Sequence, residues 1–228
     1  MARDVPELTP SVEDYLKAVW SATQHGGAAA TSAIAVRLGV SPPSVSGMIR
    51  RLSDGGLVER TPYRGVALTD EGRRAALRTI RRHRVIETFL VRVLGLEWDE
   101  VHVEAERLEH AVSDRVLERM AGALGDPEFD PHGDPIPTPD GRLPEARVTA
   151  LTDVAHGRPT TVRRVLTSEP ERLRYLSSLG LVPGAEVTVV DREPFQGPVR
   201  VRVGGGLRSV GEPLAAIVLC GPAERSDD

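Results

Sequence analysis

Apolar positions near the start of the chain recur at the spacing of amphipathic helices. One buried stripe is predicted for Val12, Tyr15, Leu16, Val19 and Trp20, which follow an i, i+3, i+4, i+7, i+8 pattern. Thr9-Pro10 is typical of an N-cap followed by proline in the first turn. A second, short helix is predicted over TSAIAVRLG, capped by Thr31 or Ser32 and ending at Gly39.

A third helix is predicted after the turn VSPPS, and two strands follow it. Its apolar positions are Val45, Met48, Ile49 and Leu52. The segment LVERTPYRGVALTDEGR indicates two short strands around residues 62–65 and then a new helix capped by Thr69. Two helices joined by a tight turn, with a two-stranded wing, form the winged helix-turn-helix pattern of DNA-binding proteins.

The third helix has the composition expected of a recognition helix. Small and polar side chains at its start fit the major groove, and arginines suit phosphates. We therefore expect DNA contacts from Ser41, Pro43, Ser44, Ser46, Gly47, Arg50, Arg51 and Arg64. A small helical bundle that binds no nucleic acid is the alternative, but the wing and the arginines together favour DNA.

Charge divides this 228-residue chain into unlike segments although its net charge is only −4. Residues 37–84 contain eleven arginines and four acidic residues, a balance of +7, whereas residues 97–140 contain thirteen acidic residues and three arginines, a balance of −10. This order predicts a polyanion-binding part followed by a cation-binding part. The single cysteine excludes an internal disulfide framework, and the absence of a long apolar run or an apolar leader predicts a cytoplasmic protein.

Histidines and glutamates share helix faces in the middle of the chain. On a helix predicted from Asp70 to Gly95, His83 and Glu87 are four residues apart. On a second helix predicted from Asp99 to Leu124, one stripe carries His102, Glu106, Glu109 and His110. Such faces are often merely solvated, but imidazole and carboxylate together are ligands for a divalent cation. We therefore expect metal ligation; His132 and His156 lie in predicted loops and receive no role.

The last third has the pattern of a small β-barrel. FDPHGDPIPTPDGRLPEA is predicted to be an extended linker, and the alternation in EVTVV and PVRVRV indicates two half-buried strands. Between linker and strands, TSEPERLRYLSSLG is predicted to be a short helix with a capping box formed by Ser168 and Glu171.

The winged module, the segment RRHRVIETFLVRVLGLEWDEVHVEAERLEHAVSDRV and the linker with DPHGDPIP together resemble the diphtheria toxin repressor family. The resemblance implies a metal-activated homodimeric repressor that binds double-stranded DNA and is not an enzyme. It also implies an α+β fold with a winged helix-turn-helix domain (1–72), a helical metal-binding and dimerisation domain (73–143) and an SH3-like domain of the FeoA type (144–228).

The resemblance implies two metal sites. The ancillary site falls on His83, Glu87 and His102, with Glu169 as a further ligand from the C-terminal domain. The primary site falls on Asp14, Glu106, Glu109 and His110, although helix periodicity alone favours a solvated Asp14. Arg172 stands where the family can supply an amide to the ancillary metal.

Two primary-site positions bear on the choice of metal. The family's iron-responsive members carry methionine in place of Asp14 and cysteine in place of Glu106, whereas manganese-responsive members carry these two acids. Carboxylate oxygens suit Mn²⁺ better than soft sulfur ligands do. The sequence thus predicts Mn²⁺ as the cofactor, with Fe²⁺ as the alternative. More distant alternatives are a metallohydrolase and a DNA-binding sensor of an organic ligand.

Overall fold

The computed structural model describes residues 8–24, 27–61, 65–145 and 147–223. Its residues fall into two compact units. One comprises the chain up to Arg82 together with Pro137–Arg142, and the other comprises the remainder. Within the described ranges, no helix combines the length and the apolar character needed to cross a bilayer.

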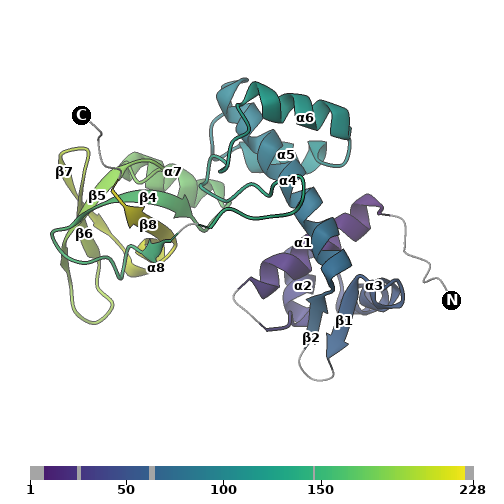
Figure 1. Cartoon of the computed structure of the whole chain (residues 1–228). Helices are drawn as coiled ribbons and strands as arrows, with labels where there is room; N and C mark the ends of the chain where they lie inside the picture. Colours follow the sequence, from purple (N-terminus) through teal and green to yellow (C-terminus); the bar gives the residue numbers. More distant parts are fainter. Residues whose placement is uncertain (1–7, 25–26, 62–64, 146, 224–228) are drawn as a thin grey trace. The chain divides into compact units, whose positions relative to one another are not determined.

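The N-terminal unit begins with a three-helix module and a two-stranded hairpin (Figure 1). Its elements are α1 (Pro10–Thr23), α2 (Thr31–Leu38), α3 (Pro42–Asp54), β1 (Val58–Thr61) and β2 (Gly65–Leu68). Helix α1 packs against α2, α3 and β2, and all five residues of its predicted stripe are buried. The antiparallel pairing of β1 with β2 confirms the predicted hairpin, whose loop residues 62–64 lie outside the described part of the chain.

Local capping explains where these helices begin. The Thr9 hydroxyl accepts a hydrogen bond from the Val12 N–H (3.4 Å), as predicted. Helix α2 begins at Thr31 itself, with Ala30 at the N-cap and no capping side chain, so the predicted cap at Thr31 or Ser32 is wrong. Gly39 ends that helix with φ 63°, a left-handed conformation that glycine adopts at little cost.

Helix α4 (Asp70–Arg92) is the long helix that the sequence predicts, shorter by one turn at its end. The Thr69 hydroxyl accepts from the Gly72 N–H (3.1 Å) and donates to the Gly56 carbonyl (2.7 Å), which confirms Thr69 as the cap. A side chain at Gly72 would overlap the carbonyl oxygen of Leu57, so α4 can lie this close to the end of α3 only with glycine there.

The second predicted helix of the middle region is two helices. Helix α5 spans Val101–Leu108 and α6 spans Asp114–Ala123, so the expectation of one helix from Asp99 to Leu124 is wrong. Ser113 caps α6 by accepting from the Val116 N–H (3.4 Å), and this new start interrupts the helix. A core cluster that includes Ile86, Val101 and Leu117 joins α4, α5 and α6.

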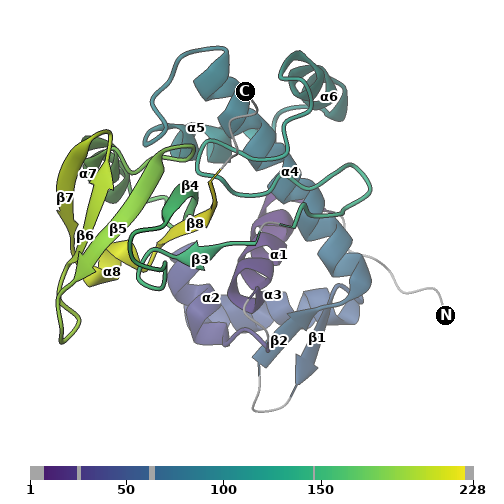
Figure 2. The ribbon, with the colours of Figure 1, turned by 60° about the vertical axis from the view of Figure 1, so that its left-hand side comes forward.

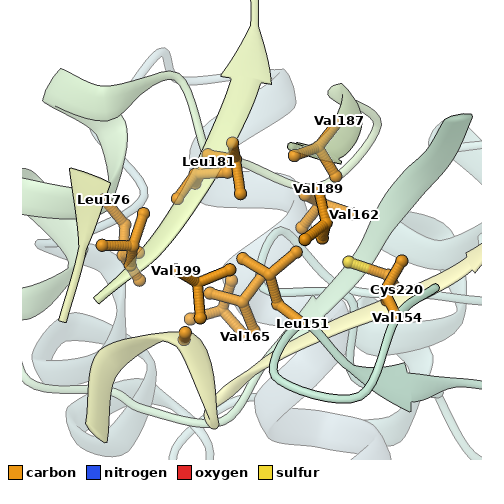
Figure 3. Close-up of a cluster of buried hydrophobic side chains, with 14 of the residues drawn as sticks. Leu151, Val154, Val162, Val165, Leu176, Leu181, Val187, Val189, Val199 and Cys220 are labelled. Atoms are coloured by element: carbon orange, nitrogen blue, oxygen red, sulfur yellow. The ribbon is translucent and has the colours of Figure 1, made fainter. Parts of the chain in front are cut away.

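The C-terminal part is a six-stranded antiparallel sheet with order β3-β8-β4-β5-β6-β7 (Figure 2). Its elements are β3 (Thr149–Ala150), β4 (Pro159–Val165), α7 (Pro170–Leu179), β5 (Glu186–Arg192), β6 (Val199–Val203), β7 (Gly206–Val210), α8 (Glu212–Ala215) and β8 (Val218–Pro222). The alternating valines of β5 and β6 point into one apolar core with residues of α7 and β8 (Figure 3). This confirms the predicted SH3-like fold.

The segment before this sheet is folded rather than extended, contrary to expectation. The Ile136 N–H donates to the Glu128 carbonyl (2.7 Å), and the Val165 N–H of β4 donates to the His132 carbonyl (2.9 Å). Gly133 has φ 83°, and a side chain there would overlap the backbone of β4. The turn over residues 128–136 is therefore packed against the sheet and belongs to its structure.

Candidate functional site

The exposed face of α3 carries the predicted DNA contacts. Val45, Ile49 and Leu52 face the core, whereas Ser41, Pro43, Ser44, Ser46, Gly47, Arg50 and Arg51 are exposed. The Ser41 hydroxyl caps the helix by accepting from the Ser44 N–H (3.4 Å), so the helix N-terminus is presented with small side chains around it. Arg64, the predicted wing contact, lies outside the described residues.

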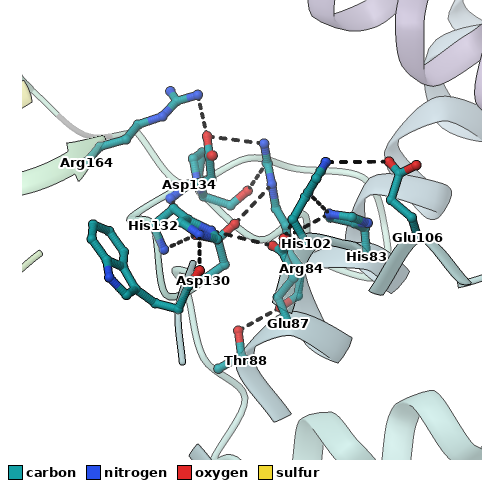
Figure 4. A network of polar contacts seen from close by, with 12 residues as sticks. His83, Arg84, Glu87, Thr88, His102, Glu106, Asp130, His132, Asp134 and Arg164 are labelled. Atoms are coloured by element: carbon teal, nitrogen blue, oxygen red, sulfur yellow. Dashed lines mark hydrogen bonds and ion pairs between the residues drawn. The ribbon is translucent and has the colours of Figure 1, made fainter. Parts of the chain in front are cut away.

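A cluster of histidine and glutamate side chains joins α4 to α5. His83 Nε2 lies 3.0 Å from Glu87 Oε1 and 3.0 Å from His102 Nδ1, and His102 Nδ1 lies 3.2 Å from the same Glu87 oxygen. His83 and Glu87 are buried, while His102 is partly exposed. The structure thus brings together the three residues of the predicted ancillary site (Figure 4).

The charge of Glu87 is stabilised although the side chain is buried. Burial alone would raise the pKa of this carboxyl, but the positive charge of His83 and hydrogen bonds from His102 and His83 hold its pKa well below its usual range. A buried carboxylate beside two imidazoles is a donor set that suits divalent first-row metals. The residues present therefore fit a metal ion.

The break between α5 and α6 sets the geometry of Glu109 and His110. Helix α5 ends with Glu109 as its C-cap, and the Glu109 side chain is fully buried. Its Oε2 lies 2.5 Å from His83 Nδ1, and its Oε1 lies 3.5 Å from His110 Nε2. Glu109 and His110 are therefore brought together, and the His83 ring links this pair to the Glu87 cluster.

The two other residues predicted for the primary site, Glu106 and Asp14, lie on different helices. Glu106 lies one turn after His102 on α5, about half exposed, with its carboxylate 3.8 Å from His102 Nε2. Potential ligand atoms of His83, His102 and Glu106 lie within 4.8 Å of one another, so Glu106 faces the ancillary cluster. Asp14 lies half-buried on α1 in the N-terminal unit, and its part in a metal site stays a prediction.

The C-terminal ligand predicted at Glu169 has another partner. Glu169 is the N-cap residue of α7, mostly exposed, and its carboxylate lies 2.8 Å from Arg172 Nε. The expected capping box is wrong, because the cap is Glu169 rather than Ser168 and no side chain bonds to the helix start. The Thr167 hydroxyl instead accepts from the Glu169 N–H (3.1 Å).

Sequence reasoning missed a further group of potential ligands. Glu87, Asp130 and His132 are all buried and bring ligand atoms within 4.8 Å of one another. Periodicity along a helix cannot find this group, because two of its members lie in the turn over residues 128–136. The sequence signal for this group was the motif DPHGD, in which His132 lies two residues from an aspartate on either side.

The winged module with an exposed recognition helix, joined in one chain to a buried histidine–carboxylate centre, defines a metal-dependent DNA-binding regulator. Residues 7–66 match the family model for the N-terminal DNA-binding domain of iron-dependent repressors, and residues 69–138 match the model for their metal-binding and dimerisation domain. Residues 149–221 match the FeoA domain.

Known proteins resemble the chain over most of its length. The iron-dependent repressor IdeR of Mycobacterium leprae is 35% identical over 195 residues, which cover 80% of this chain and 85% of the relative. The diphtheria toxin repressor of Corynebacterium efficiens is 33% identical over 198 residues, covering 82% and 86%. A solved manganese-dependent transcriptional repressor in complex with manganese superposes with a TM-score of 0.86 at 42% identity, covering 93% of this chain and all of that one.

The chain belongs to the diphtheria toxin repressor family. It is a metal-dependent transcriptional repressor with DNA-binding, dimerisation and FeoA domains, and its family consists of DNA-binding regulators rather than enzymes.

Proposed function

We propose that the chain is a manganese-activated repressor of metal-homeostasis genes, acting as a homodimer on double-stranded DNA in the cytoplasm. In this repressor, residues 1–72 form the winged helix-turn-helix that binds DNA. Residues 73–143 form the metal-binding and dimerisation domain, and residues 144–228 form the SH3-like domain. Mn²⁺ is its cofactor, and the primary site consists of Asp14, Glu106, Glu109 and His110.

The chemistry of the available donors carries the choice of manganese. The single cysteine, Cys220, lies in the C-terminal core, where it is 2% exposed and where burial raises the pKa of its thiol to about 12. Met120 packs against the core that joins α4 to α6, and Met48 lies on α3. Around the described His83 cluster the ligand atoms are nitrogen and oxygen, which suit Mn²⁺ rather than metals that prefer sulfur.

Asp14 gives the metal a means of regulating DNA binding. In this proposal its carboxylate joins Glu106, Glu109 and His110 on one ion, so that the metal connects α1 of the DNA-binding domain with the dimerisation domain. Fixing their relative orientation shifts the dimer toward the arrangement in which both recognition helices reach major grooves about 34 Å apart, or a multiple of this. Metal and DNA then strengthen each other's binding equally.

The ancillary site of the proposal lies on His83, Glu87 and His102. Glu169 is the further ligand of this site, and to reach the metal its carboxylate would have to leave its ion pair with Arg172. A folded Glu169→Ala variant that keeps the Mn²⁺ content of the parent chain would remove Glu169 from the ligand set.

The metal is tested by selecting duplexes from a random-sequence DNA library with the full chain in separate Mn²⁺, anaerobic Fe²⁺, Zn²⁺ and chelator arms. Affinities for the enriched duplexes are then compared at one fixed salt concentration, because phosphate contacts make binding strongly salt-dependent. We expect the largest gain over the chelator arm with Mn²⁺. A larger gain with Fe²⁺ would identify an iron-dependent repressor, as the names of several curated relatives suggest.

The role of Asp14 is tested by Asp14→Ala. We expect Mn²⁺ to lose its effect on DNA affinity while binding without metal stays at the parent level. Glu104→Ala is the matched control, because Glu104 is a partly exposed acid on α5 that pairs with Arg107 (2.7 Å). An Asp14→Ala variant with the parent's manganese response would refute the proposed link between domains.

A further inference from the structure

A second histidine–carboxylate group lies directly behind the first. Glu87 belongs to both groups, and its two carboxylate oxygens face in different directions. Oε1 lies 3.0 Å from His83 Nε2 and 3.2 Å from His102 Nδ1, whereas Oε2 lies 3.8 Å from His132 Nδ1. Asp130 completes the second group, and its three members are each at most 6% exposed (Figure 4).

The hydrogen bonds of His132 determine which ring nitrogen faces this group. His132 Nε2 lies 2.8 Å from the carbonyl oxygen of Trp98, and a carbonyl oxygen can only accept, so Nε2 carries the proton. In the neutral ring Nδ1 then presents a lone pair toward Glu87 Oε2, at a separation too long for a hydrogen bond. A backbone carbonyl that holds the far nitrogen of an imidazole is the usual support of a metal-binding histidine.

The His132 side chain is also held in place independently of any metal. Its ring stacks on Trp98 with centroids 5.6 Å apart, and its backbone N–H donates to Asp130 Oδ1 (2.8 Å). Its carbonyl accepts from Val165 of β4, and Gly133 next to it permits the close approach to that strand. The group is therefore preorganised by the sheet, the turn and α4 together.

The charges around the group favour a cation. Glu87, Asp130 and Asp134 are three neighbouring carboxylates; Arg84 pairs with Asp130 (3.6 Å) and Asp134 (3.2 Å), and Arg164 pairs with Asp134. The three carboxylates exceed the two guanidinium groups by one negative charge, and a bound cation would offset that excess.

We propose that Glu87, Asp130 and His132 form a third metal site, for a divalent first-row ion such as Mn²⁺, and that Glu87 bridges this ion to the one held by His83 and His102. Two ligand atoms about 2.1 Å from one ion lie roughly 3 Å apart at a right angle and about 4.2 Å apart on opposite sides. The 3.8 Å between Glu87 Oε2 and His132 Nδ1 falls in this interval. The metal at this third site would contact the turn over residues 128–136. The proposed primary and ancillary sites include no residue of that turn.

The experiment counts Mn²⁺ ions per chain by equilibrium dialysis and records the electron paramagnetic resonance spectrum of the Mn²⁺-loaded full-length protein. We expect the parent chain to give the signature of an exchange-coupled Mn²⁺ pair. His132→Gln should bind one ion fewer and lose that signature, and Asp130→Asn, which keeps an oxygen for the two backbone N–H groups, should do the same. The exposed His156→Gln is the matched control and should change neither readout.

Asp14→Ala separates this inference from the proposed function. It should lower the ion count while retaining the coupled signature, whatever metal the repressor uses for regulation. A parent spectrum without a coupled pair, or a folded His132→Gln variant with the parent's ion count, overturns the third site. In that case His132 has a structural role beside Glu87 and Asp130, and the melting temperature in chelator should fall with His132→Gln while the Mn²⁺ count stays constant.

Discussion

Gly47 offers a test in which stability and DNA binding should change in opposite directions. It lies within α3, is exposed, and a side chain added there meets no atom within 4 Å. Glycine inside a helix costs roughly 0.5–1 kcal/mol relative to good helix formers. Gly47→Gln should therefore raise the free energy of unfolding by about that amount, because nothing in the protein opposes the new side chain.

The same substitution should weaken DNA binding. The small residues around Gly47 form the surface that we expect to enter the major groove, where an added glutamine side chain would hold the helix away from the bases. We expect at least a tenfold loss of affinity for a duplex selected with Mn²⁺, equivalent to about 1.4 kcal/mol. Urea unfolding and fluorescence anisotropy at fixed salt and Mn²⁺ concentration measure the two effects.

Gly122 provides the matched control for this experiment. It is also an exposed helical glycine, on α6, with no atom within 4 Å of an added side chain. Gly122→Gln should raise stability without changing DNA affinity. If Gly47→Gln is equally stabilising and binds DNA as the parent does, then this face of α3 does not enter the groove, and the recognition surface has been assigned to the wrong residues.

Three further results are expected. Arg50→Ala and Arg51→Ala should each lower the slope of log affinity against log salt by about 0.9 if the arginine contacts one phosphate, and unchanged slopes would count against phosphate contacts. Gly72→Ala should lower the free energy of unfolding by roughly 1–3 kcal/mol in urea titrations, since its Cβ would overlap the Leu57 carbonyl; stability equal to the parent would contradict this packing. Cys220 should react with iodoacetamide at pH 8.5 only in denaturant. Because its folded pKa is raised to about 12, its contribution to stability is complete below the unfolded value of roughly 8.5 and is lost as pH rises, and rapid native alkylation would disprove this.

Regular apolar patterns made most of the fold predictable from the sequence. The stripe on α1 and the alternating valines of β5 and β6 are buried as the pattern requires, because a helix or strand with one apolar face has few ways to cover it. Caps were predictable where a hydroxyl precedes the first turn, as at Thr9 and Thr69. The cap prediction was wrong where two adjacent residues could each precede the helix, as at Ser168 and Glu169.

Helical spacing predicted that the candidate ligands at residues 83–110 lie close together, whereas it did not predict those in the turn over residues 128–136. His83 and Glu87 lie on one face of α4, so their spacing revealed them. Helical periodicity led to the prediction of one helix that continues beyond Leu108. Ser113 followed by Asp114 was a signal that a new helix begins there. Asp130 and His132 reach the centre through a turn that is fixed by its contact with β4, a long-range effect that residue spacing cannot express.

The turn over residues 128–136 also sets a limit on how far this protein is modular. If the chain were truncated before β4, the His132 carbonyl would lose its partner at Val165, and Trp98, which packs against the C-terminal core, would be uncovered. A shortened form made of only the first two domains would then lack the strand that shapes the turn beside Glu87. Removing the FeoA domain should accordingly disturb metal binding in the dimerisation domain, even though no residue of the barrel need touch the ion.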